Sequence, residues 1–204
     1  MVNEWFGVRE GLVGAARFPA LARPHHRVSV IELVLLLSCG AVSATAIAFV
    51  KLGLGIPGHS IVIATVPMAL GMSLAPRQFA GVTMSAGALG TSWGLSLLGL
   101  ATFGSGAFTS LTILGPMMDL ALRHARRGWR VYAALVVAGV ATNVLALASR
   151  AATKILGLDP GARPFDSWWL EASMTYTLSG IVAGLIGAFC WFQYHERSEH
   201  EPAE

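Results

Sequence analysis

Four residues in apolar surroundings have side chains that could hold a small ligand: His59, Trp93, Asn143 and Tyr176. Asn143 stands near the middle of an apolar stretch. An amide left unpaired in lipid is costly, so it must bond to another helix or to a solute. His59 follows a proline–glycine pair at the expected start of a helix, whose free N–H groups suit an anionic or polar group. We predict these four as substrate-binding residues, although hydrogen bonds between helices explain the polar ones equally well.

The chain lacks the sequence patterns of known catalytic and metal sites. No HExxH, GxSxG or phosphate-binding Walker A motif occurs. Cys39 and Cys190 lie inside apolar segments without CxxC or Cys/His spacing, so we expect them to be small packing residues. We therefore predict a protein that is not an enzyme, holds no cofactor or metal ion, and does not hydrolyse ATP by itself. A membrane enzyme that uses His59 with acidic residues of an outer loop is a weaker alternative.

Two acidic residues fall within apolar segments. Asp119 lies four residues before Arg123, a spacing at which side chains meet on a helix, so we expect an ion pair between them. Glu32 lies near the inner end of the first apolar segment, where it could face a cytoplasmic partner or the lipid headgroups. Neither acid has a second carboxylate close by in sequence, which argues against a paired-carboxylate site.

Composition indicates the class of protein. Of 204 residues, 54% are hydrophobic and 12% are charged, whereas a soluble domain has about 25% charged residues. This supply of charge cannot cover a soluble surface, which excludes a soluble globular enzyme and a disordered chain. The 14 lysine and arginine residues fall in short clusters between apolar runs, which is typical of topology signals in membrane proteins and not of a nucleic-acid interface. The lipid bilayer is thus the first predicted partner.

Six apolar segments are long enough, or nearly long enough, to cross a membrane. They cover residues 28–50, 61–74, 79–102, 107–122, 131–148 and 172–192. The second is short, but a helix over 58–75 would supply about 27 Å, close to the hydrocarbon thickness. If that segment were re-entrant, the chain would cross five times and its two ends would lie on opposite sides.

The distribution of basic residues favours six crossings with the N-terminus in the cytoplasm. The inner side then holds ten of them: Arg9, Arg17, Arg23, Arg27, Arg77, Arg123, Arg126, Arg127, Arg130 and Arg197. The outer side holds four: Lys51, Arg150, Lys154 and Arg163. We therefore predict an all-α integral membrane protein of the bacterial cytoplasmic (inner) membrane, a bundle of about six transmembrane helices with both termini cytoplasmic. Residues 1–27 form a cytoplasmic segment with an amphipathic stretch suited to an interfacial helix, 28–193 the membrane domain, and 194–204 a polar tail.

Small residues recur every four positions in two of the segments. The first segment contains Gly40, Ala44 and Ala48, and the third contains the GxxxG pair Gly90 and Gly94. Such stripes let helix backbones approach closely in lipid. We predict that the first stripe is a partner interface. For the third segment, packing inside the chain and contact with another subunit both stay open.

The chain resembles the S components, the substrate-binding membrane subunits of energy-coupling factor transporters. The resemblance covers residues 28–193 and rests on six short spans with both ends inside, the small-residue stripe of the first span and the Gly/Pro loop after it. It also rests on the fourth-span sequence Phe108-Thr109-Ser110-Leu111-Thr112-Ile113-Leu114-Gly115-Pro116. The predicted outer connections 51–60 and 150–171 carry Pro and Gly residues that suit a lid over an outer pocket.

The resemblance implies an outward-facing pocket, capped by the first outer loop, that captures a small solute for import. It also implies a coupling membrane subunit and cytoplasmic ATPases as partners. The family's AxxxA contact would fall on Ala44 and Ala48. The alternative is a non-catalytic accessory subunit of a larger membrane complex, in which the small-residue faces serve assembly only.

Overall fold

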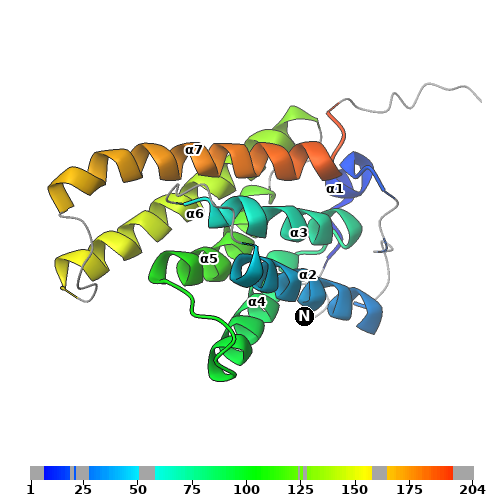
Figure 1. Ribbon diagram of the computed structural model, residues 1–204. Helices are drawn as coiled ribbons and strands as arrows, with labels where there is room; N and C mark the ends of the chain where they lie inside the picture. Colours follow the sequence, from blue (N-terminus) through cyan, green and yellow to red (C-terminus); the bar gives the residue numbers. More distant parts are fainter. Residues whose placement is uncertain are drawn as a thin grey trace, which may run out of the picture.

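We describe the protein from a computed structural model, which defines residues 7–18, 21, 28–50, 58–123, 125, 128–157 and 165–194. Within these ranges the chain is all-helical, apart from two isolated β-bridges that pair Val8 with Arg77 and Ala16 with Phe192. The helices (Figure 1) are α1 (Glu10–Ala15), α2 (Val30–Phe49), α3 (Ser60–Leu74), α4 (Ala80–Leu97), α5 (Ser105–Ala121), α6 (Trp129–Ile155) and α7 (Phe165–Trp191).

Three helices are long and apolar enough to cross a membrane: α2, α6 and the stretch Trp168–Trp191 of α7. Helix α3 is apolar but shorter, with 15 residues. Large apolar side chains point outward, among them Leu97 at 88% and Val30 at 75% exposure, and extended apolar surfaces of this kind suit lipid rather than water. The protein is therefore an integral membrane protein, while the crossing of α3, α4 and α5 stays a prediction.

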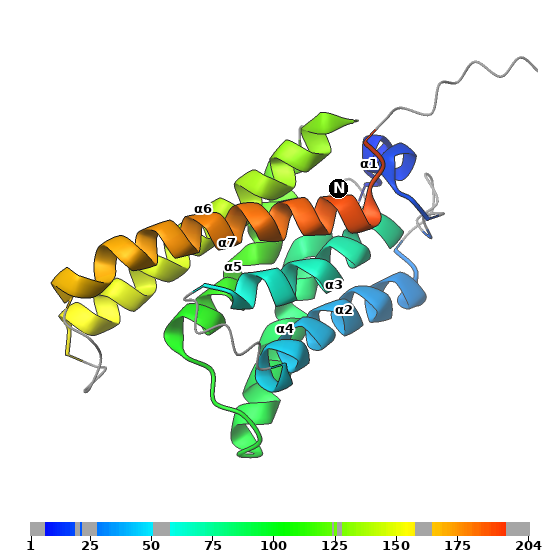
Figure 2. The ribbon, with the colours of Figure 1, turned by 45° about the horizontal axis from the view of Figure 1, so that its top comes forward.

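Helices α2 to α7 pack in a ring (Figures 1 and 2). Each helix contacts the next in the order α2, α3, α7, α6, α5, α4 and back to α2. Contacts between the ends of different helices show which helix ends lie together. One end of the ring, which we call the basal end, carries α1, the starts of α2, α4 and α6, and the ends of α3, α5 and α7. The opposite end is the distal end.

The pair α6 and α7 is the longest part of the ring. Each has 27 residues, about 40 Å at 1.5 Å per residue, and their distal ends extend past those of α3 and α5 (Figure 2). A separate small core joins them there, made of Ala146, Trp168, Ala172 and Tyr176. Arg150 and Lys154 lie over the Trp168 ring at 5.9 and 4.8 Å from its centroid and add cation–π attraction. The predicted outer loop 150–171 is thus mostly helical where it is described, because these contacts extend both helices.

Glycines allow the closest helix crossings. A Cβ added to Gly40 of α2 would overlap the backbone of α4. Gly81 of α4 and Gly115 of α5 face each other, so that a Cβ on either would overlap the carbonyl oxygen of the other. Gly139 and Gly180 make the equivalent contact between α6 and α7. Close backbone approach of this kind drives helix association in lipid, where apolar burial alone gives no preference for helix over lipid.

Helix α1 packs on the basal end of the ring. It has six residues, and Leu12 is fully buried as part of the main core. Residues 7–17 thus belong to the packed structure, in contrast to the expected helix lying on a membrane surface. Residues 1–6 and 22–27 lie outside the described residues, as does the predicted tail beyond Tyr194.

Candidate functional site

Asn143 of α6 and Tyr176 of α7 meet in the distal half of the ring. The side-chain amide of Asn143 donates a hydrogen bond from Nδ2 to the backbone carbonyl of Tyr176 at 2.7 Å. Asn143 is fully buried and Tyr176 is 3% exposed. The amide therefore ties the two longest helices together, which is one of the two roles expected for it from the sequence.

The other side of the same amide has no partner among the described residues. The Asn143 Oδ1 atom is buried and accepts no hydrogen bond from them. Leaving a buried acceptor unsatisfied costs about 1–3 kcal/mol, and a group of this kind in a native protein calls for an explanation such as a missing ligand or water. Asn143 thus offers one acceptor, at depth, to a donor from outside the chain.

Two glycines allow the start of α3 and the first turn of α5 to pack closely on Tyr176. Gly58, just before α3, has a φ of +85°, and a Cβ there would lie 3.1 Å from the Tyr176 ring. Gly106, in the first turn of α5, would place a Cβ 3.2 Å from the Tyr176 hydroxyl oxygen. Tyr176 therefore sits where α3, α5, α6 and α7 converge. We call Gly58, Gly106, Asn143 and Tyr176 the distal site.

The basic residues at the distal end of α6 lie away from the distal site. Arg150 and Lys154 follow Asn143 on α6 by seven and eleven residues, which places them about 10 and 16 Å further along the helix axis. Both side chains are directed at Trp168. The polar groups nearer the site are neutral: Thr109 of α5 donates to the Ser149 hydroxyl of α6 at 3.1 Å.

A shallow groove of about 700 Å³ runs along the same part of α7. From the described part of the chain it is lined by α7 residues between Glu171 and Ile181. Its hydroxyl groups are engaged with their own helix: Ser173 donates to the Leu170 carbonyl and Thr177 to the Ser173 carbonyl. None of the four residues of the distal site lines the groove, so the two features are distinct.

The structure brings together some, but not all, of the predicted substrate-binding residues. Asn143 and Tyr176 touch, and His59 is half-buried in the turn directly after Gly58. Trp93 lies apart from them, because its side chain points outward from α4 and is 64% exposed. Gly58 and Gly106 were not predicted as site residues. The Pro-Gly dipeptide at 57–58 indicates a turn, but nothing in the sequence says that Tyr176 packs on that turn.

The predicted partner stripe of α2 is mostly covered by the chain itself. Gly40 packs against the α4 backbone, Ala44 is fully buried, and Ala48 is half-buried. Gly40 and Ala44 are thus internal packing residues in this conformation. The opposite holds for Gly90 and Gly94 of α4: a Cβ on either would meet nothing within 4 Å among the described residues.

Two ion pairs hold the basal end. Arg77, which precedes α4, donates from Nε and Nη2 to the carboxylate of Glu32 on α2 at 3.0 and 3.2 Å. Both side chains are almost fully buried, at 4% and 6% exposure. The sequence left Glu32 facing a partner or the headgroups, whereas it faces the inside of this chain.

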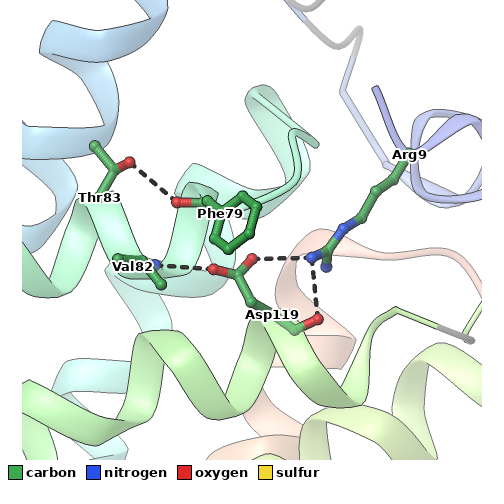
Figure 3. Close-up of polar contacts among 5 residues, drawn as sticks. All are labelled: Arg9, Phe79, Val82, Thr83 and Asp119. Atoms are coloured by element: carbon green, nitrogen blue, oxygen red, sulfur yellow. Dashed lines mark hydrogen bonds and ion pairs between the residues drawn. The ribbon is translucent and has the colours of Figure 1, made fainter. Parts of the chain in front are cut away.

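The second pair joins Asp119 of α5 to Arg9 of the N-terminal segment at 3.0 Å. Asp119 also accepts a hydrogen bond from the Val82 N–H at the start of α4, so that the two donors approach one carboxylate from opposite sides (Figure 3). Burial lowers the pKa of the Arg9 guanidinium, and the neighbouring Asp119 carboxylate opposes that shift. The predicted pair of Asp119 with Arg123 is wrong, because α5 ends at Ala121 and the helical spacing is lost beyond it.

No family model, curated protein or solved structure matches the chain. Among the described residues, no three His, Cys, Asp or Glu side chains come close enough to hold a metal ion.

Proposed function

We propose that the protein is the solute-binding membrane subunit of a transporter of the energy-coupling factor type. In this proposal α2 to α7 all cross the membrane, the basal end faces the cytoplasm, and the distal site receives a small solute from outside. The sequence resemblance to S components and the ten-to-four distribution of basic residues support the orientation.

The unsatisfied Oδ1 atom of Asn143 is the observation that carries the proposal. A fully buried acceptor at the junction of four helices fits a solute that donates a hydrogen bond. The neighbouring groups are an aromatic ring and neutral hydroxyls, so the solute that fits is small, uncharged and partly apolar.

Import against a gradient needs an energy source that this chain does not carry. It has no phosphate-binding loop, so we propose that a coupling membrane subunit and cytoplasmic ATPases act with it. The purified chain alone is expected to show no ATP turnover.

The runner-up function is that of an accessory subunit in a larger membrane complex. The open face of α4 around Gly90 and Gly94 favours it, because small residues that meet no other described residue suit close contact with a helix of another subunit. This function requires no solute at the distal site.

The deciding experiment is to identify small molecules that copurify with the detergent-extracted protein and to compare two variants. Asn143→Leu removes the free acceptor, and Thr142→Val is its matched control, because Thr142 is equally buried but bonds only to Ala138 of its own helix. We expect a stoichiometric solute with the wild-type protein and with Thr142→Val, and a loss of at least tenfold in occupancy with Asn143→Leu, about 1.4 kcal/mol or more. A wild-type protein that carries no solute, together with an intact complex of other subunits, supports the accessory function instead.

The orientation is tested by labelling single cysteines in intact cells, in a chain without Cys39 and Cys190. Arg123→Cys at the basal end and Leu156→Cys at the distal end are both exposed positions. We expect an impermeant thiol reagent to label only the cysteine at 156 from outside. Labelling of both positions from outside contradicts the proposed topology.

A further inference from the structure

The described part of the N-terminal segment crosses the basal end of the ring. Residues 7–17, which we call the strap, run from the connection between α3 and α4 to the C-terminal end of α7. Figure 1 shows α1, the helical part of the strap, beside the end of α7. The strap is attached at both of its ends.

The first anchor binds the strap to α5 and to the turn before α4. The Arg9 N–H donates to the Pro76 carbonyl at 2.7 Å, and the Gln78 N–H donates to the Gly7 carbonyl at 2.9 Å. The Arg9 guanidinium donates to both the carboxylate and the backbone carbonyl of Asp119, each at 3.0 Å. Arg9 therefore joins the strap to two parts of the ring, α5 and the turn before α4.

The second anchor binds the strap to the end of α7. The Arg17 N–H donates to the Trp191 carbonyl at 3.0 Å, and the Gln193 N–H donates to the Ala15 carbonyl at 2.8 Å. The Arg17 Nε atom adds a bond to the Phe192 carbonyl at 3.2 Å. Helix α7 cannot move away from α4 and α5 at the basal end unless one of the two anchors detaches.

Between the anchors the strap covers the core of the ring. Leu12 is fully buried and Ala15 is 6% exposed. Leu12 belongs to the same buried cluster as Met72 of α3 and Met118 of α5. Methionine side chains adapt readily to changes in their surroundings, so the core beneath the strap can rearrange when the strap leaves.

The first anchor is the one suited to open. The Nη1 atom of Arg9 is buried without a hydrogen-bond partner in the described part of the chain, and it gains water when Arg9 swings out. Asp119 keeps its bond from the Val82 N–H at 2.9 Å after Arg9 has left (Figure 3). When this anchor detaches, the guanidinium thus gains water and the carboxylate keeps one hydrogen bond.

We propose that the strap is a gate, whose first anchor detaches to open the basal end of the ring toward the cytoplasm. Release of a solute through this opening depends on the proposed function, whereas the movement of the strap does not. A coupling subunit that binds the detached strap or the uncovered basal face would favour the open state by its differential affinity for it.

The gate is tested by thiol labelling of the purified full chain, with Cys39 and Cys190 replaced by alanine. The reporter is Met118→Cys in the basal half, and the control reporter is Ala44→Cys in the distal half of α2; both positions are fully buried. We expect Arg9→Gln to raise the labelling rate with N-ethylmaleimide about tenfold or more at position 118, because labelling follows the population of the locally open state. The rate at position 44 stays unchanged.

Matched variants separate detachment of the strap from other effects. Arg9→Gln/Asp119→Asn replaces the ion pair by two amides that can bond to each other, so the rate returns toward that of the parent. Arg130→Gln removes an exposed arginine at the start of α6, at the same end, and leaves the rate unchanged. Where Arg9→Gln does not yield a monodisperse protein, Leu12→Ala carries the same expectation. An unchanged rate at 118, or equal increases at 118 and 44, overturns the gate.

The two proposals can fail separately. Selective opening at position 118 in a protein that never carries a solute rejects the proposed function and keeps the moving strap. Solute binding that depends on Asn143, in a protein whose labelling does not respond to Arg9, rejects the gate and keeps the binding subunit.

Discussion

The basal and distal ends of the ring are held by different kinds of interaction. At the basal end, two ion pairs lie in the interior and the strap adds backbone hydrogen bonds on both of its sides. In the distal half, the described contacts between helices include neutral hydrogen bonds, such as those of Asn143 with Tyr176 and of Thr109 with Ser149, and the cation–π contacts with Trp168. Breaking a buried ion pair by removing one partner is strongly destabilising, whereas a neutral bond can exchange its partner for a solute or water. The contrast indicates a distal end whose neutral bonds can be exchanged and a basal end that stays closed until an anchor of the strap detaches.

Arg77→Met gives the largest expected effect. The variant leaves the buried Glu32 carboxylate without the guanidinium that binds it twice, so we expect the free energy of unfolding to fall by about 3–5 kcal/mol. Unfolding in mixed detergent micelles, followed by circular dichroism, measures the loss. The double variant Glu32→Leu/Arg77→Met removes both charges and recovers most of it. A loss no greater than that of Asn143→Leu, about 1–2 kcal/mol, would remove the contrast between the two ends.

Alanine substitutions at two glycines of α4, Gly81 near the basal end and Gly94 near the distal end, compare how tightly the helix packs at each end. Gly81→Ala places a methyl group against the Gly115 backbone and the Asp119 carboxylate, whereas Gly94→Ala meets open space. We expect Gly81→Ala to destabilise by about 1–3 kcal/mol through overpacking. Gly94→Ala should be neutral or stabilise by up to about 1 kcal/mol through its better helix propensity. The same unfolding measurement applies, and similar losses for both glycines contradict the tight basal crossing.

Tyr176→Phe gives the smallest expected effect on stability. The tyrosine ring fills its place between Gly58 and α6, and the described residues offer its hydroxyl no hydrogen bond. We therefore expect the free energy of unfolding to change by no more than about 0.5 kcal/mol. Thermal unfolding measures this as a small shift of the midpoint temperature. Occupancy by a copurified solute should fall if the hydroxyl contacts it. A large loss of stability would place Tyr176 in the fixed framework and not in the exchangeable distal site.

Hydrophobic runs predicted the positions of the helices well, but they did not predict how far α6 and α7 extend at the distal end. The segments 28–50 and 61–74 correspond closely to α2 and α3. The segment 131–148 stopped short of the end of α6 at Ile155, because Arg150 and Lys154 interrupt the apolar run without ending the helix. Their contact with Trp168 comes from the neighbouring helix and cannot be read from a local window.

Residues of the candidate site could be predicted only where the signal lies in the local sequence. A lone asparagine in an apolar stretch demands a partner, and this pointed to Asn143 before its position was known. The partner of its Nδ2 is a backbone carbonyl on α7, which depends on the register of two helices. Arg9 and Arg77 were read as topology signals, yet each pairs with an acid far away in sequence. For Trp93, a tryptophan in an apolar segment has the same local sequence whether its side chain lines a pocket or points outward.

The order of helices around the ring has a consequence for biosynthesis. Helix α3 lies between α2 and α7, where Gly187 packs on Thr65 and Ala69 and Trp191 donates to the Val66 carbonyl at 2.9 Å. Of the described helices α7 is made last, so this face of α3 waits in the bilayer while α4, α5 and α6 are made. The strap is made before the ring and likewise finds its second anchor only when α7 is complete. A chain that stops before α7 therefore leaves one face of α3 unpaired and the strap held at its first anchor alone.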